Sequence, residues 1–190
     1  MWALVKSNKV TEVYTRPKAI TIGDINYPQN IFTLWTEAEL KAVGIYSVII
    51  DNSKKKDPEY YINTSQSFAY STSKKTVTAS YGTATARDLD DKTVSGVVTR
   101  GLKYNHKEII TNQAYGLLQP NDWLVVRNQE AGTAIPSDWT TFRTGVRTSA
   151  ESMKGKIDSA ANVDALAALY VYDDSDPPVR PLGEFPTPPE

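Results

Sequence analysis

The chain has 190 residues, 40% of them hydrophobic, and a formal net charge of -1. This length supports one full domain or two small ones, and the balanced charge gives no overall field that would attract nucleic acid or an anionic membrane. Without cysteine there is neither a disulfide framework nor a thiolate metal site, and no apolar run is long enough for a transmembrane helix. The polar N-terminus does not resemble a signal peptide, so we expect a protein made in a cytosol.

The first half of the chain carries the patterns of β-strands. Residues 2–16 predict a hairpin, residues 20–28 continue the β-rich pattern, and residues 45–50 are apolar enough for a buried strand. In residues 60–84, aromatic or β-branched residues alternate with polar ones, which predicts two or three antiparallel strands. Turns are expected at Ser7 and Asn8, at Gly23 and Asp24, at Thr64 and Ser65, and at Ser73 and Lys74.

One short helix is expected within this β-rich part, over residues 36–44. Thr36 and Glu39 have the spacing of a capping box, in which each side chain binds the backbone N–H of the other residue. Gly44 suits the left-handed conformation that commonly ends a helix.

The chain contains three short runs of like charge. The lysines of residues 54–56 could contact phosphate or an acidic partner, and the aspartates of residues 88–91 and 173–176 could hold a cation or perform acid–base chemistry. Neither acidic run has the spaced oxygen ligands and the distant glutamate that calcium requires. We therefore interpret the three runs as exposed turns or helix caps.

From about residue 85 the pattern becomes helical. The first helix is expected to run through residue 118 and to stop at Pro120, which cannot continue it. Its apolar face would consist of Val98, Leu102, Ile109, Tyr115 and Leu118.

A second helix is expected to begin at Ser137 or Asp138, either of which can cap it. A third is expected over residues 162–170, with Asn162 as its cap. Because the connecting loops are short or moderate, an antiparallel helical unit is favoured. The apolar positions of the second helix are Trp139, Phe142, Val146, Ala150, Met153 and Ile157.

The end of the chain, residues 171–190, holds six of the eleven prolines. It can form neither a helix nor an inner strand, so we expect an extended arm with polyproline character in places. Such an arm is either disordered or laid on a surface, its own or a partner's. Its apolar anchors are Tyr170, Tyr172, Leu182 and Phe185.

The chain has no recognisable set of catalytic residues. His106 is the only histidine, and its place among charged residues in the first predicted helix indicates an exposed side chain. One histidine without cysteine nearly excludes zinc, and the glycines match no phosphate-binding loop. We expect no enzyme, no metal and no cofactor. Aromatic residues on the predicted strands could stack on sugars, which leaves a sugar-binding face as a minority option.

One stretch resembles a known family. Residues 117–147, LLQPNDWLVVRNQEAGTAIPSDWTTFRTGVR, are similar to a segment of tailed-phage tail-fibre-associated or tail-fibre assembly proteins, whose pattern is roughly LL..TDW...(R)......P......YR..LR. The chain departs from this pattern at Asn121, where threonine is usual, and at Phe142, where tyrosine is usual. A looser similarity to phage fibre-region proteins covers YPQNIFTLWTEAELKAVGIYSV. The matching positions of the first stretch are Leu117, Leu118, Asp122, Trp123, Arg127, Pro136, Phe142, Arg143, Val146 and Arg147.

The same residues have a physical interpretation. We expect Asp122 to cap the turn that follows Pro120 and Trp123 to bury its ring against both helices. Arg143 and Arg147 lie four apart on one helix face and could clamp Asp122, Glu130 or the aromatic rings. The corner is interpreted as an internal junction that fixes the fold, with a docking surface for another protein as the alternative. Its residues are Asp122, Trp123, Arg127, Trp139, Phe142, Arg143 and Arg147.

These features predict an α+β fold with a β-rich domain over residues 1–84, a helical domain over 85–170 and an extended partner-binding arm over 171–190. The resemblance implies a non-enzymatic structural or adaptor protein of a phage tail, baseplate or tail fibre, made in the host cytoplasm and carried in the virion. Its partners would be other tail or fibre proteins and further copies of itself, but neither nucleic acid nor membrane. The alternative is a tail-fibre assembly chaperone, and a carbohydrate-binding or hydrolytic fibre module ranks last.

Overall fold

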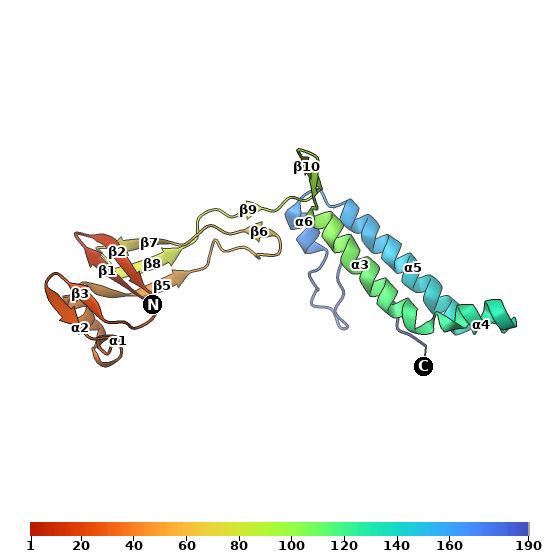
Figure 1. Ribbon diagram of the computed structural model, residues 1–190, viewed down its shortest axis with the longest axis horizontal. Coiled ribbons are helices and arrows are strands. Elements are labelled where there is room, and N and C mark those ends of the chain that lie inside the picture. The colour runs from red at the N-terminus through yellow and green to blue at the C-terminus, as the bar shows by residue number, and fades with distance from the viewer. Residues whose placement is uncertain (190) are drawn as a thin grey trace. The chain divides into compact units, whose positions relative to one another are not determined.

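Residues 1–189 are described by a computed structural model, which combines strands and helices in an α+β fold (Figure 1). The chain divides into two compact units, one over residues 1–85 and one from residue 86 onward. The first unit is built mainly from strands and the second mainly from helices. The expected fold class is therefore confirmed.

A five-stranded sheet forms most of the first unit, in the order β2-β1-β5-β8-β7. Neighbouring strands are antiparallel, except that β5 and β8 are parallel. The edge strands β2 and β7 also contact each other, so the sheet curls around one face, where Ala3, Val77 and Ala79 are buried. The strands are β1 (Trp2–Lys6), β2 (Lys9–Tyr14), β5 (Ile45–Asp51), β7 (Ser67–Ser71) and β8 (Thr76–Ser80).

Two short helices supply the rest of this unit's core. Leu4 and Ile45 from the sheet pack with Phe32 and Leu40 from the helices in one buried cluster. The sequence predicts only the second helix, and the additional first one is a single turn that places Phe32 in the core. The helices are α1 (Ile31–Leu34) and α2 (Glu37–Ala42).

Both ends of α2 are capped as the sequence predicts. The backbone N–H of Thr36 donates to Glu39 Oε2 at 2.7 Å, and the N–H of Glu39 donates to Thr36 Oγ1 at 3.3 Å, which completes the capping box. The first of these bonds, followed by the bond to the Thr36 side chain, lowers the pKa of the Glu39 carboxyl. Gly44 has φ +84°, and an added Cβ there would lie 2.9 Å from the Val5 carbonyl oxygen.

Three short strand pairs complete the β-structure. In β3–β4 the turn lies at Gly23, which has φ +62°, as the sequence predicts. The expected turn at Thr64 and Ser65 is wrong, because β6 pairs with β9 and no turn forms between β6 and β7. Thr64 Oγ1 instead accepts a hydrogen bond from the Gly82 N–H at 2.7 Å. The strands are β3 (Ile20–Ile22), β4 (Ile25–Tyr27), β6 (Tyr61–Ile62), β9 (Thr85–Ala86), β10 (Lys92–Val94) and β11 (Val97–Thr99).

The second unit contains a pair of long helices, α3 and α5, which pack along each other (Figure 1). The prediction that a helix begins near residue 85 is wrong, because β10 and β11 form a hairpin and α3 begins only at Leu102. Ser95 and Gly96 both have positive φ, which suits the two-residue turn of a hairpin. The helices are α3 (Leu102–Leu118), the 3₁₀ turn η1 (Gln119–Asn121), α4 (Trp123–Ala131), α5 (Ser137–Asp158) and α6 (Val163–Ala168).

The buried face of α3 differs from the predicted one. Its buried residues follow a spacing of four: Leu102, His106, Ile110 and Ala114. Val98 lies exposed on β11, and the predicted Ile109 and Tyr115 are also exposed. The helix therefore presents a neighbouring row of residues to α5.

The prediction for α5 is correct for its face but not for its cap. Trp139 is only partly buried, whereas the other predicted positions are buried: Phe142, Val146, Ala150, Met153 and Ile157. Pro136 occupies the N-cap position, so neither Ser137 nor Asp138 caps the helix. In α6 the predicted cap is present, and the Ala165 N–H donates to Asn162 Oδ1 at 2.8 Å.

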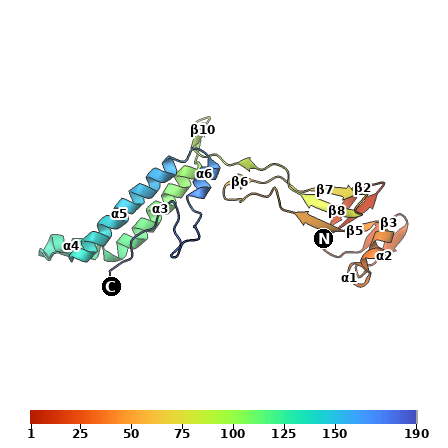
Figure 2. The same cartoon turned by 180° about the vertical axis from the view of Figure 1, so that it is seen from behind.

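The proline-rich arm folds back onto its own helical unit (Figure 2). Leu182 is buried, its N–H donates to the Leu169 carbonyl at 2.9 Å, and Lys156 Nζ donates to the Pro181 carbonyl at 2.7 Å. An added Cβ on Gly145 of α5 would lie 3.2 Å from the ring of Pro186. The arm thus covers part of the apolar surface of the helical unit.

Candidate docking surface at the helical corner

The corner between α3 and α5 is held by Arg143. Its Nη2 lies 2.7 Å from Asp122 Oδ1, and its Nη1 donates to the Leu118 carbonyl at 3.0 Å and to Asn121 Oδ1. Asn121 in turn donates from Nδ2 to the Leu117 carbonyl at 2.9 Å. The predicted clamp between Arg143 and Asp122 is therefore present.

Burial makes this pair structurally important. The side chain of Arg143 is 7% exposed, whereas that of Asp122 is 52% exposed. A guanidinium removed from water requires several acceptors in good geometry, and here a carboxylate, an amide oxygen and a backbone carbonyl supply them. Asn121 is one of the acceptors and is itself buried.

Asp122 occupies the cap position after the turn η1, where its N–H donates to the Gln119 carbonyl, but its side chain makes no capping bond and its carboxylate is turned toward Arg143. The expectation for Trp123 is wrong. Trp123 does not bury its ring, since the chain continues directly into α4 and the side chain is on the solvent side, 56% exposed. The guanidinium of Arg127, one turn further on, lies over this ring at 4.7 Å from its centroid.

The other residues named from the sequence take smaller roles. Arg147 donates from Nη1 to the Arg143 carbonyl at 3.3 Å and its side chain is exposed. Trp139 and Phe142 form an edge-to-face pair with ring centroids 5.8 Å apart. Both rings lie on α5, and Phe142 belongs to the buried face of that helix.

The helix α4 carries an exposed apolar face. Leu124 points inward, whereas Val125 and Val126 are 43% and 53% exposed and join Trp123 on the surface. The sequence interpretation contained no helix here. The signal for a helix was present in the sequence. Residues 123 to 131 contain neither proline nor glycine, and Gly132, which has φ +65°, is the residue type that commonly ends a helix.

The arm has an anchored part and an exposed part. Leu182 is buried and Phe185 is partly buried, but Tyr172 is 50% exposed. Tyr172 Oη donates to Glu184 Oε1 at 2.7 Å, and this bond, more than burial, raises the pKa of the tyrosine. The guanidinium of Arg180 lies 5.3 Å from the centroid of the Tyr172 ring.

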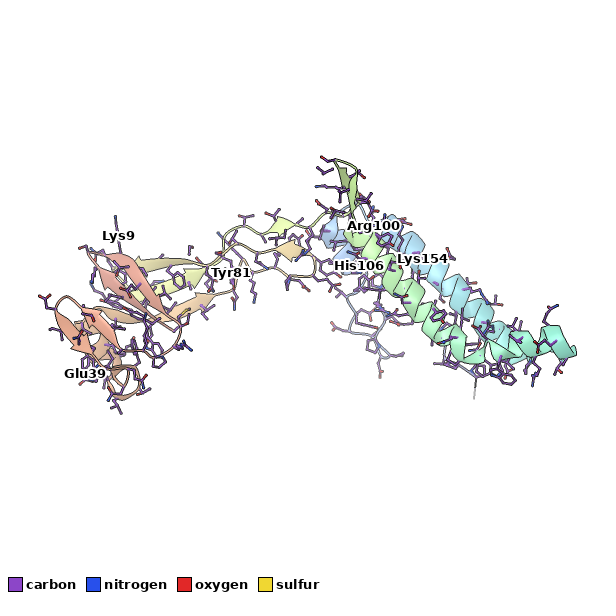
Figure 3. The ribbon with its side chains drawn as sticks, in the orientation of Figure 1. Lys9, Glu39, Tyr81, Arg100, His106 and Lys154 are labelled. Atoms are coloured by element: carbon purple, nitrogen blue, oxygen red, sulfur yellow. The ribbon has the colours of Figure 1, made fainter. Side chains whose placement is uncertain are left out.

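His106, which Figure 3 labels on α3, is buried, contrary to the expectation of an exposed side chain. Its Nδ1 is 2.8 Å from Tyr170 Oη, and the two rings are in contact with centroids 4.9 Å apart. Tyr170 is therefore an internal anchor between α3 and the start of the arm.

The acidic run at residues 88–91 makes structural ion pairs. Asp91 binds Arg100 at 2.5 Å and accepts from the Gly101 N–H at 2.8 Å, and Asp90 binds Lys103 at 3.1 Å. The backbone bond from Gly101 and then the bond from Arg100 lower the pKa of Asp91. Among residues 1–189, no group of three or more His, Asp or Glu side chains is placed to hold a metal ion.

No helix in the described part of the chain is long and apolar enough to cross a membrane. Comparison of the chain with models of known protein families, with curated proteins and with solved structures found no match. What the chain does is therefore inferred from the geometry of the corner and from the resemblance of residues 117–147.

Proposed function

We propose that this chain is a non-enzymatic structural or adaptor protein of a phage tail, baseplate or tail fibre, and that it acts by docking to neighbouring tail proteins. One observation carries the proposal. Asp122 and Arg143, which fit the family pattern, are the two residues that fix the corner, and the helix leaving that corner exposes Trp123 and Val126.

The exposed face of α4 has the composition of a binding surface. Tryptophan and arginine are enriched among the residues that dominate protein–protein binding energies, and Trp123 and Arg127 are already stacked on each other. Because Arg143 holds the start of α4, these side chains are ordered before a partner arrives. Such preorganisation lowers the entropy cost of association.

Mass spectrometry of purified particles tests the assignment to the virion. A fixed copy number relative to the major capsid protein, in threes or sixes, is the expected result for a tail component. Presence in the infected-cell lysate together with absence from particles would instead assign the chain to the tail-fibre assembly chaperones. Saturable binding or cleavage of host polysaccharide would support the fibre-module alternative.

A paired substitution tests the docking surface itself. In Trp123→Ala with Val126→Ser, incorporation into particles is expected to fall at least about tenfold, since loss of one central anchor commonly costs more than 1.4 kcal/mol of binding. The helical circular dichroism and the thermal transition should remain those of the wild type, because both side chains are exposed.

The matched control is Tyr115→Ala with Ile109→Ser, which removes similar exposed apolar surface from α3. Normal incorporation of this control, together with loss in the α4 variant, is the expected pattern. Normal incorporation of both variants would show that α4 is not the docking surface.

A further inference from the structure

The helix α4, which leaves the corner at the end of the long helices (Figure 1), carries an arginine whose charge is unpaired. The guanidinium of Arg127 is half-buried and lies over the ring of Trp123. Its Nε is buried without an acceptor, and within residues 1–189 the group forms neither a hydrogen bond nor an ion pair. Because a ring attracts a cation but is no conventional hydrogen-bond acceptor, Arg127 keeps its capacity to bind an anion.

Other arginines of the second unit find acceptors within their own chain. Arg147 donates to a backbone carbonyl at 3.3 Å. Three more bind a carboxylate: Arg100 binds Asp91, Arg143 binds Asp122 and Arg180 binds Glu184. A half-buried guanidinium without such a partner has lost part of its hydration with no acceptor in return, so binding of an acceptor is favoured.

The carboxylates close to Arg127 in the sequence do not serve it. Asp122 is bound by Nη2 of Arg143 at 2.7 Å. Glu130, three residues after Arg127, is exposed and forms no ion pair with it. In the described part of the chain, an acceptor other than solvent must therefore come from another molecule.

The surroundings of Arg127 indicate what kind of acceptor fits. Trp123 and Val126 lie on the same face of α4 at helical spacing, and both are more than half exposed. A partner that covers these side chains removes water from the guanidinium, which strengthens its attraction to a negative charge. The planar fork of arginine matches a carboxylate with two parallel bonds. Since Glu130 cancels the one cation of α4, this helix has no field that would hold a polyanion.

We propose that the partner docked on α4 presents a carboxylate beside an apolar side chain. The carboxylate, from an aspartate, a glutamate or a chain end, binds Arg127, and the apolar side chain packs on Trp123 and Val126. This inference rests on the proposed docking function, because it specifies the chemistry that α4 recognises. The pair selects the partner, and the apolar contact supplies most of the affinity.

NMR titration of the full chain with two small probes tests the inference without any phage component. Phenylacetate carries a carboxylate beside an apolar ring, and phenylacetamide is its neutral counterpart. Phenylacetate should shift the Trp123 indole and Arg127 guanidinium signals with a dissociation constant on the order of millimolar. Phenylacetamide should bind there at least about tenfold more weakly. Because the signals are read residue by residue, binding elsewhere does not interfere.

Four variants assign the preference to Arg127. Arg127→Gln should abolish it, whereas Arg127→Lys should retain only part of it, because the charge remains but the fork is lost. Glu130→Gln should strengthen phenylacetate binding, since it removes a like charge near the incoming carboxylate. The control Arg147→Gln changes an exposed arginine of α5 and should bind both probes like the wild type.

Two outcomes would overturn the inference. If the wild type binds both probes equally at Trp123, or neither of them up to about 20 mM, Arg127 does not select a carboxylate. The wild-type comparison needs no substitution, so it stands even if a variant fails to fold. A preference that survives in Arg127→Gln, with the helical circular dichroism intact, would assign the selection to another group.

The count of this chain in purified particles separates this inference from the proposed tail function. A chain that prefers phenylacetate but is absent from particles would contradict the tail function and support the carboxylate site. A chain that is present in particles but does not distinguish the probes would contradict the carboxylate site alone. If both hold, Arg127→Gln should lower incorporation into particles about tenfold, whereas Glu130→Gln should not.

Discussion

At the scale of single residues, Arg143 is the side chain on which the corner depends. The substitution Arg143→Met keeps most of the apolar stem but removes the donors to the Leu118 carbonyl and Asn121 Oδ1. Buried acceptors without a donor cost about 1–3 kcal/mol. We expect the free energy of unfolding of the second unit to fall by that amount in urea titrations followed by helical circular dichroism.

The matched control lies one turn away on the same helix. Arg147 is exposed and makes only a bond to a backbone carbonyl, so Arg147→Met should change the unfolding free energy by no more than about 0.5 kcal/mol. Equal losses in the two variants would mean that the network around Arg143 does not hold the corner.

Single residues were predicted correctly where the argument used helical spacing, and wrongly where it used neighbours in sequence. The pair of Arg143 and Asp122 could be expected, because Arg143 lies on α5, which packs back along α3 beside the corner at Asp122. His106 could not be judged from Asn105 and Lys107, since neighbours in sequence lie on other sides of a helix. Its row with Leu102, Ile110 and Ala114 at a spacing of four would have indicated burial.

At the scale of elements, the arm acts as part of the core of the second unit. Leu182 is 1% exposed, and the substitution Leu182→Ala should lower the free energy of unfolding of this unit by about 2–5 kcal/mol. Urea titration measures this loss, and Val171→Ala, at a 63% exposed position of the arm, should have little effect. A Leu182→Ala chain as stable as the wild type would show that the arm is only loosely attached.

A test of the arm in assembly must separate its part in the fold from any contact with a partner. Removal of residues 171–190 would take Leu182 and its bond to Leu169 away with any partner contact. Loss of assembly after such a deletion would then reflect a damaged fold. Substitutions of exposed arm residues separate the two effects.

Elements were predictable where caps and periodicity agreed. The capping box of α2 and the apolar face of α5 were both predicted from their spacing. The hairpin of β10 and β11 was missed because its turn, Ser95 and Gly96, lies inside a stretch whose apolar residues also fit helical spacing. A short run of that kind fits both the helical spacing and the alternation of a strand. The glycine is the signal that favours a hairpin turn.

At the scale of the whole molecule, strand order is the feature that sequence patterns could not supply. The parallel pairing of β5 with β8 joins Val48 to Val77 across two other strands of the chain. Local alternation predicts that such segments are strands but not which neighbours they choose. The curl that brings β2 against β7 depends on that order as well.

The two units are expected to fold independently, because each has its own buried core. The cut belongs between Arg87 and Asp88. Fragment 1–87 then keeps β9 with its partner β6, and fragment 88–190 keeps the Asp88 carbonyl that accepts from the Leu102 N–H at 2.9 Å.

Each fragment should give a dispersed NMR spectrum and a single cooperative unfolding transition of its own. A cut between residues 134 and 135 is the control, because it separates α3 from α5 and divides the network of Arg143. Both pieces bordering that cut should lose the cooperative transition of the helical unit. An unfolded 1–87 or 88–190 would instead mean that the units stabilise each other and that the chain folds as one body.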